Sequence, residues 1–194
     1  MSETPKKPEF QSLQNHFLIA MPGLNDPFFH HTVTYVCEHN EEGAMGLVIN
    51  QPIGLTVASL LEQIDVEVTT ARTLEDLHVL TGGPVATDRG FVLHPPQEGW
   101  RSSLQLSDEI MITTSRDILE ALGSDRAPQH FLLTLGYAGW EAGQLEEELA
   151  DNSWLTIPAD ADLLFHTPTG QRWEKAAERL GFEISQLSSE AGHA

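Results

Sequence analysis

One stretch of the sequence, His130-Phe-Leu-Leu-Thr-Leu135, is its most apolar candidate for a β-strand. Hydrophobicity that continues without alternating is typical of a strand covered on both faces. We therefore expect residues 130–135 to lie at the centre of a sheet. The segment that follows, Gly136-Tyr-Ala-Gly-Trp140, carries glycines that predict a tight turn or a close approach to another element.

Further strand and helix candidates flank this stretch on both sides. Residues 32–37 and 44–49 are separated by a turn-prone segment, which predicts an antiparallel pair. Other expected strands cover residues 16–21, 77–80, 89–94, 110–113 and 153–157. Helices are expected at 57–63 with Thr56 as N-cap, at 117–122 ended by a left-handed Gly123, at 144–150, and at 172–180 ended by Gly181. This interleaving of hairpin-like strands and scattered helices predicts the α+β class.

The length of the chain indicates one domain. Its 194 residues are enough for one sizeable core, and no interior run rich in proline, glycine or serine is long enough to be a linker. The ends lack periodic apolar positions, which is typical of frayed termini. We predict a single domain over residues 12–184, with flexible termini at 1–11 and 185–194.

The charge of the chain restricts its partners. Against 29 Asp and Glu there are 10 Lys and Arg, which gives a formal net charge of -19. Affinity for nucleic acid rests largely on cations that displace counterions from phosphates, so direct binding to DNA is not expected. We expect instead a protein partner or a small molecule, and the sequence leaves the oligomeric state open.

Cysteine usage and hydropathy predict a cytoplasmic protein. The single cysteine, Cys37, excludes an intrachain disulfide. The amino terminus has no apolar run behind its two lysines, so we expect no secretory signal. The longest apolar stretches fall far short of the roughly 20 residues that cross a bilayer, and no membrane contact is expected.

Common catalytic signatures are absent from the sequence. It has no Walker phosphate loop, no His-Glu-x-x-His, no Gly-x-Ser-x-Gly and no Gly-x-Gly-x-x-Gly after a strand. None of its nine histidines has another at the i, i+4 spacing that aligns two metal ligands on a helix. We therefore predict no metal site and no cofactor. The clustered acids are read as solvated faces, with a cation-assisted hydrolase as the alternative.

Cys37 and His39 form a candidate thiol and base. On a regular strand the two side chains share a face about 6–7 Å apart, and Glu38 points away. A free cysteine is usually a small buried hydrophobe, and the negative field of the chain raises the pKa of a thiol. A packed, inert thiol is thus favoured, and a redox sensor or enzyme that uses Cys37 stays open as the alternative.

Several motifs resemble those of a known family. They are the run from His16 to Pro52, with Gly-Ala-Met-Gly-Leu-Val-Ile-Asn-Gln-Pro at its end, then Gly82-Gly-Pro-Val85, Arg89-Gly-Phe-Val-Leu-His94 and residues 136–146. In these motifs the chain resembles the AlgH/YqgE family over roughly residues 12–182. The resemblance implies one α+β domain with a strongly bent, mixed, barrel-like sheet and flanking helices. It also implies a nominal role as a transcriptional regulator of alginate synthesis, and it supplies no catalytic residues.

The motif positions gather on turns and strand ends, where binding surfaces often form. With no recognisable catalytic set, we interpret the chain as a non-enzymatic regulatory or binding protein that acts through a protein or a small ligand. The candidate binding residues are Asn50, Gly82, Gly83, Arg89, His94 and Trp140.

Overall fold

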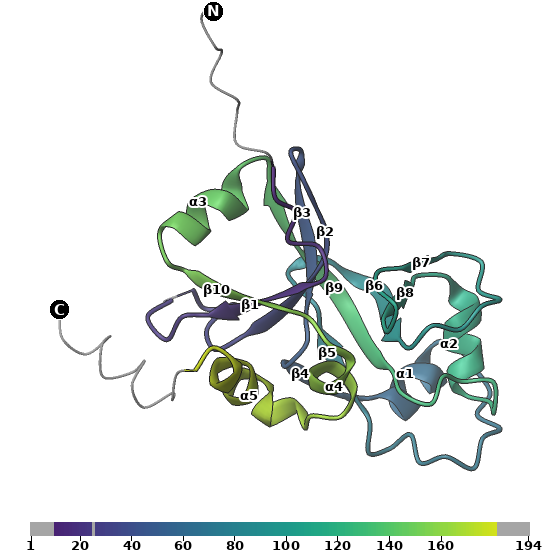
Figure 1. The fold of residues 1–194 in the computed structure, drawn as a ribbon. Coiled ribbons are helices and arrows are strands. Elements are labelled where there is room, and N and C mark those ends of the chain that lie inside the picture. The colour runs from purple at the N-terminus through teal and green to yellow at the C-terminus, as the bar shows by residue number, and fades with distance from the viewer. Residues whose placement is uncertain (1–9, 25, 182–194) are drawn as a thin grey trace, which may run out of the picture.

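Ten strands form one continuous sheet in the computed structural model, which describes residues 10–24 and 26–181 (Figure 1). The predicted flexible termini lie outside the described residues, apart from Phe10 and Gln11. The strands are β1 His16–Ala20, β2 Val33–Asn40, β3 Gly43–Val48, β4 Pro52–Thr56, β5 His78–Thr81, β6 Val85–His94, β7 Ser103–Gln105, β8 Met111–Thr113, β9 Leu132–Glu141 and β10 Trp154–Pro158. The helices are α1 Val57–Gln63, α2 Arg116–Leu122, α3 Gln144–Ala150, α4 Ala161–Phe165 and α5 Arg172–Arg179, with a short 3-10 turn at Thr169–Gln171.

The strand order places β9 in the middle of the sheet, as the apolar stretch at residues 130–135 predicts. The main path runs β10-β1-β2-β3-β9-β6-β8-β7, and β4 pairs with β5, which in turn pairs with β9. The β5–β9 pair is parallel, whereas the other strand pairs are antiparallel, so the sheet is mixed. The expected antiparallel pair of residues 32–37 and 44–49 is confirmed as β2 and β3.

Glycines allow β9 to bend in its middle and to touch the segment before β6. Gly136 has a φ of +80°, a left-handed conformation that glycine adopts without strain. A Cβ at Gly83 would overlap the backbone of Tyr137, and one at Gly82 would overlap the carbonyl of Gly136. The amino-terminal half of β9 pairs with β5 and β6, and its carboxyl-terminal half pairs with β3. The sheet thereby curls into a half-barrel, and the predicted α+β fold is confirmed.

Helices cover both faces of the curled sheet (Figure 1). Phe17 and Ile19 of β1 face a core that includes α4 and α5, and the alternate residues Leu18 and Ala20 face a second core with α3. A third core joins α1 and α2 to β5, β6 and the first half of β9. Thr56 caps α1 as expected, because its side chain accepts a hydrogen bond from the Ser59 N–H at 3.1 Å.

Gly123 ends α2, but its predicted left-handed conformation is wrong. Its φ is −81°, and a Cβ there would lie 2.6 Å from the Glu67 carbonyl oxygen. The Gly123 carbonyl also accepts hydrogen bonds from the N–H groups of Thr69 and Thr70. Close approach of the 67–70 segment, and not backbone handedness, therefore requires glycine here. Gly181 follows the end of α5, as predicted, and it is this glycine that adopts the left-handed conformation, with a φ of +82°.

Candidate functional site

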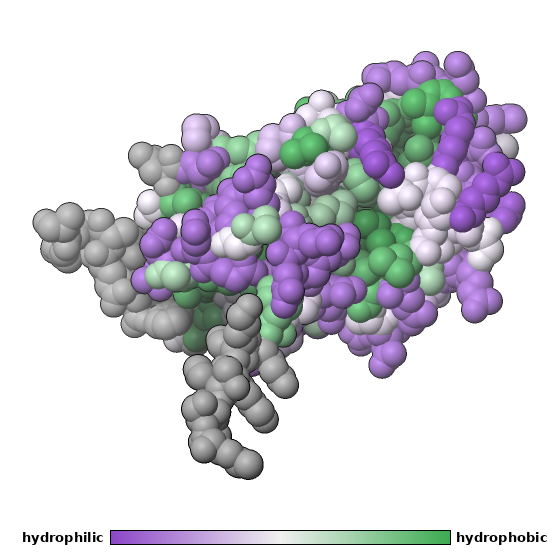
Figure 2. Space-filling model, turned by 90° about the horizontal axis from the view of Figure 1, so that it is seen from above, coloured by the Kyte–Doolittle hydropathy of each residue, from purple (hydrophilic) through white to green (hydrophobic). Residues whose placement is uncertain are grey.

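A cavity of about 530 Å³ opens between the edge strand β7 and the β2–β3 hairpin, and we call it the β7 cavity. In the described residues β7 pairs with β8 alone, so its outer edge is free. Figure 2 shows hydrophobic surface among hydrophilic side chains toward this β6–β8 end of the molecule. The cavity is lined by Cys37, Glu38, Met45, Arg89, Phe91, Ser102, Ser103, Leu104, Ile112, Thr114 and Tyr137.

Most of this lining is apolar, and its charges are balanced. Arg89 and Glu38 are the one cation and the one carboxylate among the lining residues. The Arg89 guanidinium carbon lies 5.5 Å from the centre of the Phe91 ring, which is within cation–π range. Four side chains with hydroxyl groups, Ser102, Ser103, Thr114 and Tyr137, add donors and acceptors to the lining.

Cys37 lines the cavity as a protonated thiol. Its side chain is buried, and its Sγ donates a weak hydrogen bond to the Tyr35 carbonyl at 3.8 Å. Burial raises the pKa of the Cys37 thiol well above its ordinary value, and the nearby Glu38 carboxylate raises it further. Because the thiolate is the reactive form, this environment favours the packed thiol over the redox alternative.

Cys37 and His39 lie on different faces of the sheet, so the expectation of a shared face is wrong. A β-bulge falls between Val36 and Glu38, and Cys37 is the extra residue. After the bulge, Glu38 pairs with Met45, and both line the β7 cavity beside Cys37. An inserted residue shifts the alternation of the strand by one position, which turns His39 to the other side.

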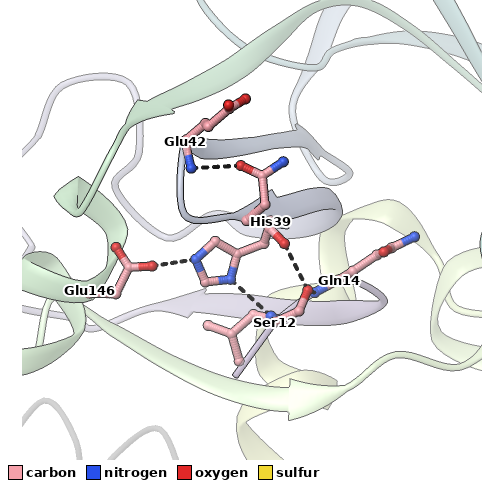
Figure 3. Close-up of polar contacts among 7 residues, drawn as sticks. Ser12, Gln14, His39, Glu42 and Glu146 are labelled. Atoms are coloured by element: carbon pink, nitrogen blue, oxygen red, sulfur yellow. Dashed lines mark hydrogen bonds and ion pairs between the residues drawn. The ribbon is translucent and has the colours of Figure 1, made fainter. Parts of the chain in front are cut away.

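His39 is held on the α3 side of the sheet (Figure 3). Its Nδ1 accepts a hydrogen bond from the Leu13 N–H at 2.9 Å, and its Nε2 lies 2.5 Å from the Glu146 Oε1 of α3. The Ser12 hydroxyl donates to the His39 carbonyl at 2.9 Å. The histidine thus fastens the segment before β1 and helix α3 to the β2–β3 hairpin, away from the thiol.

Comparison with known proteins identifies the family. Residues 17–185 match the family model described as AlgH-like. The chain belongs to the AlgH-like family. A UPF0301 protein of Idiomarina loihiensis is 64% identical to this AlgH-like chain over 183 residues, which cover 94% of the chain and 99% of the relative. A UPF0301 protein of Pseudoalteromonas translucida is 60% identical over 184 residues, covering 95% and 100%.

Solved structures share the AlgH-like fold. The solution structure of the AlgH protein from Pseudomonas aeruginosa superposes with a TM-score of 0.77 at 52% identity, covering 97% of this chain and 100% of that one. A crystal structure of a protein from Corynebacterium diphtheriae has a TM-score of 0.68 at 17% identity, covering 89% and 90%. The second likeness shows the common fold alone.

Of the predicted site residues, the AlgH-like fold brings Arg89 and Cys37 together at the β7 cavity. Asn50 instead connects two strand ends, because its Oδ1 accepts from the Val33 N–H and its Nδ2 donates to the His31 carbonyl, both at 2.9 Å. Gly82 and Gly83 lie in the close backbone contact with β9. These residues position the sheet and do not line the β7 cavity.

His94 and Trp140 are also packed inside the AlgH-like domain. The ring nitrogens of His94 lie 2.7 Å from the Pro95 carbonyl and 2.7 Å from the Thr113 hydroxyl, and burial lowers the pKa of its imidazole. Trp140 belongs to the core beneath α3, next to Trp154. Sequence reasoning missed Phe91, Leu104 and Tyr137 as lining residues, because only the curled sheet brings these distant strands together.

The described part of this AlgH-like chain contains neither a candidate metal site nor a candidate membrane-spanning helix. Over residues 10–24 and 26–181, no group of three or more His, Cys, Asp or Glu side chains is placed to hold a metal ion. Within the same ranges, no helix has the length and apolarity needed to cross a bilayer.

Proposed function

We propose that this AlgH-like protein is a non-enzymatic binding protein whose β7 cavity takes a small, uncharged, mainly apolar molecule. The observation that carries the proposal is the cavity itself. Its volume of about 530 Å³ falls within the roughly 300–1,000 Å³ that is typical of ligand sites. Mainly apolar walls with a few polar groups are also typical of such sites.

The charge balance of the lining supports an uncharged ligand. An anion would be attracted by Arg89 but repelled by Glu38. A cation would be attracted by Glu38 but repelled by Arg89. The hydroxyls of Ser102, Ser103 and Thr114 can orient a neutral polar group by hydrogen bonds. Burial of the apolar part against residues such as Phe91 and Ile112 supplies the affinity.

Binding without turnover is supported by the state of the thiol. Cys37, the nucleophilic side chain of the cavity, is protonated, and His39 faces α3 on the other side of the sheet. Among the described residues, the thiol donates its hydrogen bond to the Tyr35 carbonyl, and no base of the cavity is hydrogen-bonded to it. Thiol catalysis needs a thiolate or an adjacent base.

A regulatory role, nominally in alginate synthesis, would be exerted through the bound ligand or a protein partner. The net charge of -19 opposes direct contact with a phosphate backbone. The free edge of β7 is suited to pair with an extended segment of another protein. Because β7 residues line the cavity, a bound ligand can alter the position of this edge and thereby its affinity for the partner.

Indole, which is uncharged and mainly apolar, is a suitable probe for this proposal. We expect a saturable shift of the Met45 and Ile112 methyl signals in NMR spectra during titration, because both side chains line the cavity. Ser103→Trp places a large side chain in the opening and should weaken indole binding about tenfold. Gln105→Trp is the matched control, since Gln105 is an exposed residue of the same strand outside the lining.

Two results would refute the proposal. One is a set of methyl shifts that never saturate, which indicates only general solvent effects. The other is equal indole affinity in the Ser103→Trp variant and the unmodified protein, provided that both are folded.

A further inference from the structure

A second, smaller cavity lies between the β4–β5 pair and the carboxyl-terminal helices. Its volume is about 220 Å³, and we call it the Arg172 cavity. It shares no lining residue with the β7 cavity. The lining consists of Pro52, Val57, Arg72, Asp76, Leu77, His78, Leu80, His130, Phe131, Leu132, Leu133, Phe165, Thr169 and Arg172.

Arg172, the first residue of α5, is a buried cation whose charge is not neutralised. Its relative exposure is 4%, and it forms no ion pair with any carboxylate of the described residues. Its Nη1 donates to the Ile49 carbonyl, and its Nη2 donates to the Leu164 carbonyl at 3.0 Å. Its Nε is buried without a hydrogen-bond partner.

This arrangement is costly for a purely structural arginine. Removing a charge from water costs several kcal/mol unless a counter-charge compensates for it, and the unpaired Nε–H adds about 1–3 kcal/mol. Burial alone lowers the pKa of the Arg172 guanidinium to about 10, so the side chain remains charged at neutral pH. The two carbonyl contacts hold the guanidinium in place, but they supply no counter-charge to it.

The lining around Arg172 contains a second arginine and several apolar side chains. Arg72 also lines the cavity, where its guanidinium carbon lies 5.2 Å from the centre of the Phe131 ring. Its Nη1 donates to the Pro128 carbonyl at 3.0 Å. Asp76 is the one carboxylate among the lining residues, so two arginines face a single acid in a chain whose net charge is -19.

We propose that the Arg172 cavity binds a small organic carboxylate that supplies the missing counter-charge to Arg172. The apolar body of the ligand lies against side chains such as Leu80, Phe131 and Leu133. Charge-assisted hydrogen bonds between a guanidinium and a carboxylate are among the strongest in proteins. The apolar walls disfavour inorganic phosphate, which carries no group that could replace its water shell against them.

Benzoate is the probe for this site, and the Nε–H signal of Arg172 in a ¹H–¹⁵N spectrum is the readout in the unmodified protein. We expect benzoate to shift this signal saturably, and inorganic phosphate at equal concentration and ionic strength to leave it in place. No shift with benzoate up to its solubility limit overturns the proposal. A shift by phosphate and not by benzoate overturns the proposed ligand class.

Variants at exposed arginines separate specific binding from general attraction. Arg72→Met, at the cavity, should weaken benzoate binding about threefold, the size expected for a partly exposed ion pair. Arg126→Met removes an exposed charge that does not line the cavity and should leave the affinity unchanged. Equal weakening by both variants would show that benzoate responds only to net charge and would refute the site.

Discussion

The β7 cavity and the Arg172 cavity differ in the environment of their arginines. Arg89 in the β7 cavity is exposed, packs on Phe91 and has Glu38 as a charged neighbour in the lining. Arg172 is buried, is fixed by two backbone carbonyls and has no carboxylate partner in the described residues. Exposed charges are stabilised by water, whereas a buried charge needs a partner. The difference indicates that Arg89 needs no ionic partner and is compatible with a neutral ligand. Arg172 lacks a counter-charge, which favours an anionic ligand.

The largest expected effect comes from the backbone contact on which the half-barrel is built. Gly83→Ala should destabilise the protein by about 4 kcal/mol, because its Cβ would overlap the Tyr137 backbone and force β9 away. Gly170→Ala is the control, since nothing lies within 4 Å of a Cβ there. Urea unfolding of both variants measures this. Similar stability of the two would mean that β9 and the Gly83 segment are not in contact.

Removing each arginine compares the two cavities directly. Arg172→Ala leaves the Ile49 and Leu164 carbonyls without their donor and should cost about 2–3 kcal/mol of unfolding free energy. Arg89→Ala removes an exposed side chain and should change stability by less than about 0.5 kcal/mol. Equal losses in urea unfolding would abolish the contrast between the two sites.

The labelling rate of the Cys37 thiol measures access to the β7 cavity, because Cys37 lines this cavity and not the Arg172 cavity. Because the pKa of Cys37 is raised by burial, its alkylation by iodoacetamide at pH 8 should be about 100-fold slower than in the urea-unfolded chain. Since the thiol stays protonated, the labelling rate should still be rising at pH 9. Indole should slow the labelling further, and benzoate should not. Rapid labelling with a plateau below pH 8 would restore the reactive-thiol alternative.

The smallest expected effect tests why the β7 cavity prefers neutral ligands. Glu38→Gln should alter stability by less than about 0.5 kcal/mol, because Glu38 is exposed. It should nevertheless allow benzoate to shift the Met45 methyl signal, because Arg89 would then be unbalanced. The double variant Glu38→Gln with Arg89→Met should lose this response. Benzoate binding at Met45 in the unmodified protein would contradict the charge-balance argument.

The sequence was sufficient to predict the elements but not the details that form the sites. Apolar runs and cap residues correctly predicted the central strand β9, the N-cap Thr56 and Gly181 as the end of the last helix. These features depend on local periodicity and on the conformational preferences of single residues. The α+β class follows from them.

Features that depend on distant contacts were not predictable in this way. The bulge at Cys37 adds one residue to β2 without a local signal, so the faces of Glu38 and His39 were exchanged. Arg172 resembles any charged residue at the start of a helix, and only the docking of α5 against α4 and the end of β3 buries it. Gly123 was correctly identified as a helix end. Its close contact with the Glu67 carbonyl was not predictable, because Glu67 is distant in the sequence.

The most direct test follows ligand binding at both cavities in the same protein sample. Indole and benzoate are added separately while the Met45 methyl and the Arg172 Nε–H signals are followed by NMR. We expect indole to shift the methyl signal and leave the Nε–H signal unchanged, and we expect benzoate to do the reverse. If both compounds move the same signal, or neither moves any, the division into a neutral site and a carboxylate site is wrong.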